Sequence, residues 1–224
     1  MKHYELDDLG LELKFEECRR AGKLLCGIDE AGRGALAGPV VASAVILTGP
    51  APAGLTDSKA LTPKRRESIY ADLQSCAHIG VGIIEVDVID QVNILQANFM
   101  AMQSALRDLW SKTAPDTARF VIVDGNYLTA ALIQDCQAAG IEAFSLVRGD
   151  AKVAAISAAS VIAKVTRDRI MRAMETTYPG YGFAKSAGYG SPAHMNRLKE
   201  AGPCREHRKS FAPVAAAIKS GAKP

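Results

Sequence analysis

The feature that most constrains this chain is a set of five short apolar runs, each bounded by glycine, proline or charged residues. Runs of this length that are rich in valine and isoleucine are typical of buried β-strands. The fourth run is apolar at every position, which suits a strand covered on both faces in the middle of a sheet. The expected strands cover residues 24–28, 39–47, 79–86, 120–123 and 143–147.

Helical patterns separate the later strands and close the chain. Thr62 and Pro63 form an expected N-cap and first helical residue, and Gly202 is an expected helix end. Small residues from Ser157 to Ser160 crowd the first half of the longest pattern, which indicates close contact between that helix and the sheet. The expected helices cover about residues 63–76, 94–110, 128–139, 152–176 and 192–201, with a short one from about residue 213.

Strands that alternate with helices, followed by helices alone, predict an α/β sandwich around a five-stranded mixed sheet. No internal repeat, low-complexity tract or linker interrupts the pattern. We therefore expect one domain over residues 1–224, in which a helical C-terminal region of about residues 190–224 packs on the rest.

The composition indicates a globular protein of a reducing compartment. Hydrophobic residues make up 48% of the 224 residues, enough for a sizeable core. The five cysteines are widely spaced without a C-x-x-C pair, which argues against a disulfide framework and a zinc ribbon. Residues 1–17 are rich in charge, so no signal peptide is expected, and no segment approaches the roughly 18 apolar residues of a membrane span. We expect a cytoplasmic monomer that does not bind a membrane.

The net charge of +3 permits nucleic-acid binding without requiring it, so the positions of the basic residues matter more than their number. Each basic group is often only a solvated helix face, but together on one surface they would form a phosphate-binding track. Lys59 and Lys164 are our first candidates for phosphate contact. His207 is expected to be structural or to make a peripheral phosphate contact rather than to catalyse. The basic groups lie at residues 64–66, 164–172 and 205–209.

Carboxylates stand at or just beyond three expected strand ends: Asp29 with Glu30, Asp124, and Asp150. Ligand sites of α/β proteins assemble at such ends, and carboxylates that converge there repel one another unless a cation intervenes. Oxygen ligands suit Mg²⁺ or Mn²⁺, and two such ions can activate a water for phosphodiester hydrolysis. Each acid alone could be a solvated turn residue. Neighbours in a strand point to opposite faces, so Asp29 and Glu30 share one site only if the strand bends there.

Gly32-Arg33-Gly34 follows the first expected strand and, with Gly38, matches the spacing of a dinucleotide-binding glycine motif. That motif requires a helix after the glycines, whereas Pro39 and the β-branched run behind it predict a strand. We therefore expect no small-molecule cofactor. The glycines would let the backbone approach a bulky ligand, with Arg33 available for a phosphate, although a plain tight turn would also explain them.

An ordered series of motifs extends from about residue 25 to residue 213. The first is Gly27-Ile28-Asp29-Glu30-Ala31-Gly32-Arg33-Gly34. The others are Asp57-Ser58-Lys59, Asn93-Ile94, Val123-Asp124-Gly125-Asn126, Gly149-Asp150, Ser157-Ala158-Ala159-Ser160, Ala163-Lys164-Val165, Tyr181-Gly182-Phe183, Gly188-Tyr189-Gly190, His207-Arg208 and Ser210-Phe211. The series resembles the type 2 ribonucleases H, specifically bacterial ribonuclease HII, and its specificity comes from the order of many blocks.

The resemblance implies the ribonuclease H fold and a metal-dependent endoribonuclease, with Asp29, Glu30, Asp124 and Asp150 as catalytic carboxylates that bind Mn²⁺ or Mg²⁺. It implies a two-metal-ion hydrolysis of the RNA strand in RNA–DNA hybrids, which leaves 3′-hydroxyl and 5′-phosphate ends. It also implies incision at ribonucleotides embedded in duplex DNA, as in ribonucleotide excision repair. The partners would be these two kinds of duplex.

The same resemblance assigns residues that bind the substrate. Gly32, Arg33 and Gly34 would contact the 2′-hydroxyl of the ribonucleotide, and Tyr189 would pack at the RNA–DNA junction. Such contacts agree with the chemistry, because only the 2′-hydroxyl distinguishes RNA from DNA at one sugar and an exposed aromatic ring can stack on sugar or base. Arg148 stands where the family usually has lysine, which keeps the charge. No long C-terminal extension follows the last block, so a clamp-binding tail is not expected.

Two other functions remain open from the sequence. A duplex-binding module with a decayed site is disfavoured because all four carboxylates are present, and metal-dependent cleavage would exclude it. A general two-metal DNA nuclease would cut an all-DNA duplex as readily as one that contains a ribonucleotide.

Overall fold

The computed structural model describes residues 5–221. Its centre is a five-stranded sheet with the order β3-β2-β1-β4-β5. β1 pairs antiparallel with β2, and β2 with β3, whereas β1 and β4 and then β4 and β5 pair in parallel. The mixed five-stranded sheet is thus confirmed. The strands are β1 (Leu24–Ala31), β2 (Val40–Leu47), β3 (Ala77–Ile84), β4 (Ala118–Asp124) and β5 (Glu142–Leu146).

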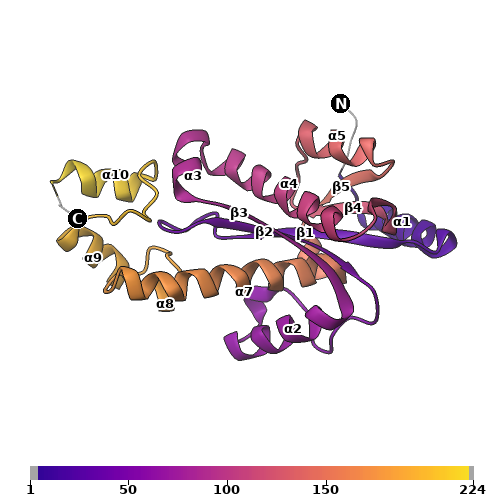
Figure 1. Cartoon of the computed structure of the whole chain (residues 1–224), viewed down its shortest axis with the longest axis horizontal. Coiled ribbons are helices and arrows are strands. Elements are labelled where there is room, and N and C mark those ends of the chain that lie inside the picture. Colours follow the sequence, from indigo (N-terminus) through magenta and orange to yellow (C-terminus); the bar gives the residue numbers. More distant parts are fainter. Residues whose placement is uncertain (1–4, 222–224) are drawn as a thin grey trace.

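Helices cover both faces of the sheet. Figure 1 shows α3, α4 and α5 above it and α2 and α7 below. The α4 face buries side chains such as Ile28 and Val123, and the opposite face packs Val45 against α7. The helices around the sheet are α1 (Asp8–Ala21), α2 (Pro63–Cys76), α3 (Val86–Val92), α4 (Ile94–Lys112), α5 (Ala130–Ala138), α6 (Gly149–Lys152) and α7 (Ala154–Thr177).

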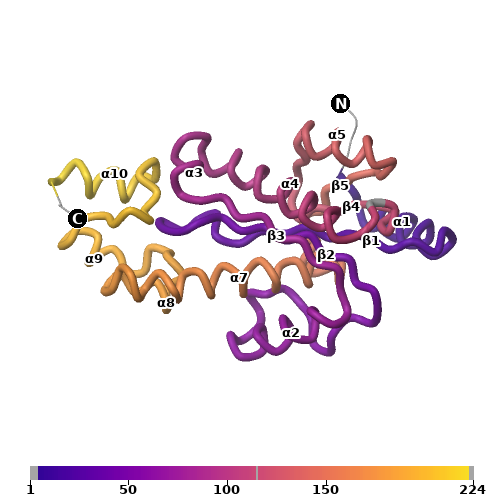
Figure 2. The backbone as a smooth tube through the Cα atoms, viewed as in Figure 1, coloured from indigo at the N-terminus to yellow at the C-terminus, as the bar shows by residue number. Residues whose placement is uncertain are grey.

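The C-terminal region is helical, as expected, and comprises α8 (Phe183–Ser186), α9 (Pro192–Ala201) and α10 (Ala212–Lys219). The tube in Figure 2 shows that α8, α9 and α10 lie beyond one end of the sheet, next to the loop between β1 and β2. The Gly38 amide in that loop donates to the Glu206 carbonyl at 2.8 Å, which joins the two regions. The expected limits 1–224 and 190–224 extend beyond the described residues, and the division into one domain stays a prediction.

Close packing between helix and sheet explains the small residues of α7. A Cβ atom added at Gly27 of β1 would lie 2.4 Å from the backbone of Ala155, so only glycine permits this approach. The residues from Ser157 to Ser160 are all buried. The predicted close contact between this helix and the sheet is therefore confirmed.

The structure differs from the sequence prediction at several elements. α1, α3 and α8 were not predicted, although Asp7 caps the first turn of α1 by accepting from the Gly10 amide at 2.7 Å. The long helix expected over 152–176 is two helices, because Val153 between them has an extended backbone. β1 continues past residue 28 to Ala31, where we expected the strand to end.

Candidate active site

The parallel pairing of β1 with β4 brings two carboxylates side by side. Ile28 pairs with Val123, so the next residues in register are Asp29 and Asp124, the last residue of β4. Asp29 follows Gly27 on the face of β1 that contacts α7, and only 5% of its surface is exposed. The Asp124 carboxylate accepts a hydrogen bond of 2.7 Å from the Gly149 amide. Strand pairing thus holds the backbones of Asp29 and Asp124 next to each other.

Asp29 and Glu30 remain in the strand and point to opposite faces. Asp29 pairs with Ser43 of β2 and Glu30 with Ala42, so β1 does not break at this point. The bend that a site lined by both side chains would require is absent at this point. Glu30 nevertheless lies near enough to Asp124 for their charges to interact, because β4 ends there and no longer separates them.

Burial and neighbouring carboxylates raise the pKa values of Asp29, Glu30 and Asp150. The pKa of Asp29 lies well above its usual value because of burial and then the charges of Glu30 and Asp124. Burial also raises the pKa of Glu30, an effect that Arg33 reduces through an ion pair of 3.1 Å. Burial and the charge of Asp124 raise the pKa of Asp150. The site therefore concentrates negative charge where water solvates it poorly.

Lys59 is the cation that faces this group of acids. Partial burial lowers the pKa of the Lys59 ammonium. The negative charges around it outweigh this effect, so that its pKa is raised; they belong to Asp57, Asp29, Asp150 and Asp124. Its Nζ lies 3.9 Å from Asp150 Oδ2, and the lysine side chain is 80% exposed. Lys59 interacts with the charges of Asp29, Asp124 and Asp150 at once, which indicates that these three acids lie around one region.

A cleft of about 530 Å³ opens beside Asp124 and Asp150. The Ser157 hydroxyl donates to the Asp150 carbonyl at 2.6 Å, which holds α6 against α7. Asp29 and Glu30 do not line this cleft. The lining residues are Asp57, Lys59, Asp124, Gly125, Asn126, Val147, Arg148, Asp150 and Ala151.

The residues fit a hard divalent cation by their chemistry. Among residues 5–221, no three histidine, cysteine or acidic side chains already lie close enough to hold a metal ion together. The four predicted carboxylates nevertheless supply only oxygen donors, and burial and mutual repulsion destabilise the charged forms of Asp29, Glu30 and Asp150. A divalent cation would relieve this repulsion, since its charge favours ionised carboxylates.

The glycine loop and Tyr189 lie against each other. Gly32 has a φ of 97°, and a Cβ atom there would lie 2.0 Å from Arg167 Nε. A Cβ at Gly34 would lie 3.7 Å from Cε1 of Tyr189, whose ring is partly exposed at 41%. Arg33 is exposed and paired with Glu30. The structure therefore brings the loop and the aromatic residue together beside the carboxylates.

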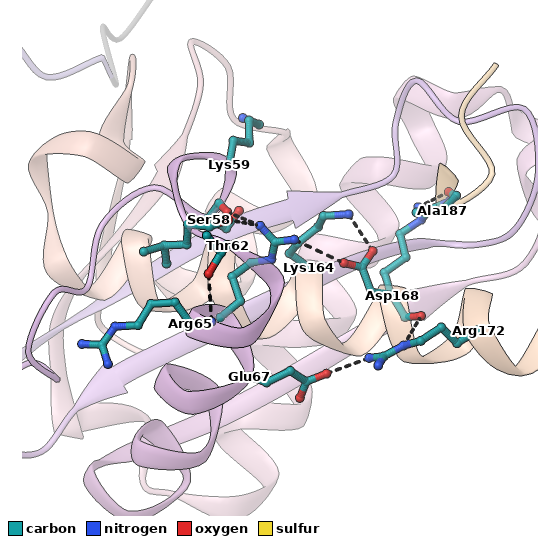
Figure 3. A network of polar contacts seen from close by, with 12 residues as sticks. Ser58, Lys59, Thr62, Arg65, Glu67, Lys164, Asp168, Arg172 and Ala187 are labelled. Atoms are coloured by element: carbon teal, nitrogen blue, oxygen red, sulfur yellow. Dashed lines mark hydrogen bonds and ion pairs between the residues drawn. The ribbon is translucent and has the colours of Figure 1, made fainter. Parts of the chain in front are cut away.

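The basic residues divide between a surface groove and the interior. Lys164 Nζ contacts Asp168 at 2.6 Å, and Arg172 contacts Glu67 at 2.7 Å, as Figure 3 shows. Five cations and these two acids leave the groove, of about 430 Å³, positively charged. The groove is lined by Pro63, Lys64, Arg66, Glu67, Lys164, Val165, Asp168, Arg172, Ala184, Lys185, Ser186 and Ala187.

Arg167 and Arg208 belong to the interior, although we had grouped both with the surface track. Each side chain is fully buried, so neither contributes to a phosphate-binding surface. His207 is also fully buried, which supports the structural role and not the peripheral phosphate contact. The sequence carries no signal that separates these residues from their exposed neighbours. Asp57 was likewise not assigned to the site, although its motif was noted.

No helix among residues 5–221 is long and apolar enough to cross a membrane.

Comparisons with known proteins identify the family. A model of the family Ribonuclease HII matches residues 26–214. Ribonuclease HII of Parvibaculum lavamentivorans is 46% identical over 212 residues, which cover 94% of this chain and 74% of that protein. The crystal structure of the ribonuclease H2 from Pyrococcus horikoshii matches with a TM-score of 0.69 and 25% identity, covering 90% of this chain and all of that one.

A second solved structure supports the fold alone. Bst-RNase HIII in complex with Mn²⁺ matches with a TM-score of 0.69 and 18% identity, covering 88% of this chain and 70% of that one. The motif series falls within the residues that the family model matches, and the five-stranded mixed sheet agrees with the fold of the solved structures. The chain therefore belongs to the ribonuclease HII family, the endonucleases that degrade RNA in RNA–DNA hybrids.

Proposed function

We propose that this protein also incises duplex DNA at embedded ribonucleotides, and that it does so by a two-metal-ion mechanism with Asp29, Glu30, Asp124 and Asp150 as ligands. The observation that carries the proposal is the register of β1 with β4, which places Asp29 beside Asp124 where β4 ends. Around this pair the charges of Glu30 and Asp150 converge on Asp124. Membership of the family supports the cleavage reaction, and the positions of the acids support their assignment as metal ligands.

Asp29 and Asp124 are the proposed principal ligands of Mg²⁺ or Mn²⁺. Both continue one face of the sheet, and the hydrogen bond from Gly149 orients the Asp124 carboxylate. Glu30 and Asp150 would complete the ligand set from the two sides. Two bound divalent cations would activate a water and stabilise the leaving 3′-oxygen. The products would be 3′-hydroxyl and 5′-phosphate ends.

Recognition of the ribose is assigned to Gly32, Arg33 and Gly34. Glycines let backbone amides and carbonyls approach a sugar, and a 2′-hydroxyl both donates and accepts. Tyr189 lies next to Gly34 and would pack on the sugar or base at the RNA–DNA junction. The loop and the tyrosine would therefore together recognise the ribonucleotide and its junction with the DNA.

Backbone phosphates would be held by cations around this centre. Lys59 is mostly exposed and close to Asp150, so it would contact a phosphate next to the scissile bond. Lys164 pairs with Asp168 in the basic groove, as Figure 3 shows. Lys64 and Lys185 also line this groove and add positive charge. Contacts to phosphates read no sequence, and their strength falls as the salt concentration rises.

The test uses one DNA duplex with a single ribonucleotide, an all-DNA duplex of the same sequence and an RNA–DNA hybrid. Each is end-labelled and incubated with Mg²⁺, Mn²⁺ or EDTA, and the products are mapped on a sequencing gel. We expect metal-dependent cuts in the hybrid and one cut beside the ribonucleotide. Equal cutting of the all-DNA duplex would instead indicate a general nuclease, and binding without cutting would indicate a non-catalytic module.

The variant Asp124→Asn tests the carboxylate assignment. Asparagine keeps an oxygen that accepts from the Gly149 amide, so we expect the fold and duplex binding to persist. Cleavage should fall by at least about 100-fold, because changes even outside the direct ligands of a metal commonly cost 10- to 100-fold. Asp116→Asn is the matched control, since this exposed acid forms a surface ion pair with Lys23. Undiminished turnover of Asp124→Asn at high Mn²⁺ would refute the assignment.

A further inference from the structure

Residues 204–208, which we call the 204–208 segment, are built into the loop that follows β1. The Gly38 amide donates to the Glu206 carbonyl, and the Arg208 amide donates to the Leu36 carbonyl, both at 2.8 Å. Ala37 and His207 form an isolated antiparallel bridge. The segment therefore pairs with residues 36–38 of the loop between β1 and β2, although about 170 residues separate Ala37 from His207 along the chain.

The side chain of Arg208 donates to three backbone carbonyls of this loop. Its Nη1 donates to the Arg33 carbonyl at 2.9 Å, in the middle of the Gly32–Gly34 turn. Its Nε and Nη2 donate to the carbonyls of Gly38 and Pro39 at 3.0 and 3.1 Å. Within residues 5–221, no carboxylate forms an ion pair with Arg208. Burial lowers the pKa of Arg208 to about 9. The charge of Asp90 offsets this effect only in part. Since a buried charge is costly unless it is hydrogen-bonded, the three carbonyls hold the guanidinium in place against the loop.

Arg167 repeats the arrangement from α7. It donates to the carbonyls of Pro39, Ala37 and Ala187 at 2.8, 3.0 and 2.8 Å. Its guanidinium carbon lies 5.6 Å from the centre of the Tyr189 ring. The two arginines thus share the Pro39 carbonyl and connect the glycine loop to the loop that carries Tyr189.

A chain of two histidines joins the 204–208 segment to Tyr189 itself. The Cys204 amide donates to His207 Nδ1 at 3.0 Å, so the proton of this ring lies on Nε2. Nε2 then donates to His194 Nε2 at 2.9 Å, which leaves the proton of His194 on Nδ1. His194 Nδ1 donates to the Tyr189 carbonyl at 2.9 Å. Every donor in the chain has an acceptor only while both rings are neutral.

We propose that Arg208 and His207 are positioning residues for ribose selectivity. Arg208 holds the backbone of Gly32–Gly34, and His207 acts through His194 on the backbone of Tyr189. Because both belong to the 204–208 segment, that segment sets the distance between the loop that would read the 2′-hydroxyl and the ring that would pack at the junction. This inference rests on the proposed function and adds which residues would give rise to the selectivity for ribose.

The test compares Arg208→Lys and Arg208→Gln with the control Arg107→Gln, an exposed arginine on α4 that pairs with Asp135. We expect kcat/KM on the single-ribonucleotide duplex to fall by about 100-fold in both Arg208 variants, since a displacement of about 1 Å can cost that much. Lysine should not rescue activity, because a point charge cannot replace a fork that reaches three carbonyls. Binding of an all-DNA duplex in EDTA, followed by fluorescence anisotropy, should change less than about threefold.

A second measurement keeps the inference independent of catalysis. Hydrogen exchange should show at least tenfold faster exchange at Leu36, whose amide donates to the Gly188 carbonyl, in Arg208→Lys but not in Arg107→Gln. His207→Gln should give the same loss of kcat/KM, and it replaces the Arg208 variants if these unfold. Rescue by lysine, or loss of all-DNA binding in parallel with cleavage, would show that the charge of Arg208 matters and would overturn the inference. Failure of the wild-type protein to cut the ribonucleotide duplex would refute the proposed function, whereas unchanged exchange at Leu36 would refute the positioning role.

Discussion

The buried histidine His207 makes the stability of this protein depend on pH. Burial and the neighbouring His194 lower the pKa of His207 to about 4, against about 6.5 for an unperturbed histidine. The unfolded chain therefore takes up a proton as the pH falls below about 6.5, whereas the folded protein does so only near pH 4. The stabilisation by neutral His207 is fully present above pH 6.5 and is lost as the pH falls toward 4.

The magnitude follows from the two pKa values. A pKa of about 4 in place of about 6.5 corresponds to at most about 3 kcal/mol, of which about 2 kcal/mol is lost by pH 5. For a chain of this size, 2 kcal/mol corresponds to a shift in Tm of about 4–8 °C. The titratable groups that face the ring are His194, Cys204 and Tyr181, and none supplies a negative charge at this pH that would stabilise the imidazolium.

Carboxylates with raised pKa values change the free energy of unfolding in the opposite direction as the pH falls. A variant is therefore needed to separate the contribution of His207 from theirs. Asp29, Glu30 and Asp150 bind protons more readily in the folded protein, and their protonation favours the fold as the pH falls. A His207 variant retains the contribution of these carboxylates and lacks that of His207. The difference between the wild type and this variant therefore reports His207 together with its effect on the hydrogen-bonded His194.

The assay is urea unfolding followed by circular dichroism at pH 7.5 and pH 5.0. Between these values the wild type should lose about 2 kcal/mol more of its free energy of unfolding than His207→Gln. His78→Gln is the matched control, because this histidine is exposed on β3, and it should behave as the wild type. Equal losses in all three proteins would show that His207 titrates near its ordinary pKa when folded, and would refute the reasoning.

Further predictions concern the glycine loop, the tyrosine and the groove. Gly32→Ala should lower the free energy of unfolding by about 2–3 kcal/mol in thermal or urea unfolding, because it combines a positive φ with a clash against Arg167; an unchanged stability would contradict the geometry. Tyr189→Ala should reduce cleavage at a single ribonucleotide by at least about tenfold, because about 1–3 kcal/mol of stacking disappears, and an unchanged rate would exclude junction packing. Replacing Lys64 and Lys185 by alanine should make the negative slope of log K against log salt less steep by about 0.9 for each phosphate that the variant no longer neutralises, and an unchanged slope would place the duplex elsewhere.

The sequence predicted the elements of the sheet because their signals are local. Short apolar runs bounded by turn residues marked all five strands, and the proline at position 63 marked the start of α2. α1 was missed although Asp7 and Gly22 cap it, since only Leu11 and Cys18 of its 14 residues are buried and charged residues surround them in the sequence. The end of β1 was placed at residue 28 because Asp29 and Glu30 resemble turn residues, whereas pairing with β2 on one side extends the strand to Ala31.

By itself the sequence determined the fold class, the family and the identity of the candidate acids, because periodicity, turn chemistry and motif order are properties of neighbouring residues. Only the tertiary structure decided which charged groups are exposed. Arg167 and Arg208 resemble the surface cations around them, yet both are buried on backbone carbonyls from a loop far away in the chain. Burial depends on contacts between distant segments, and the cost of removing a charge from water is visible only when those contacts are known.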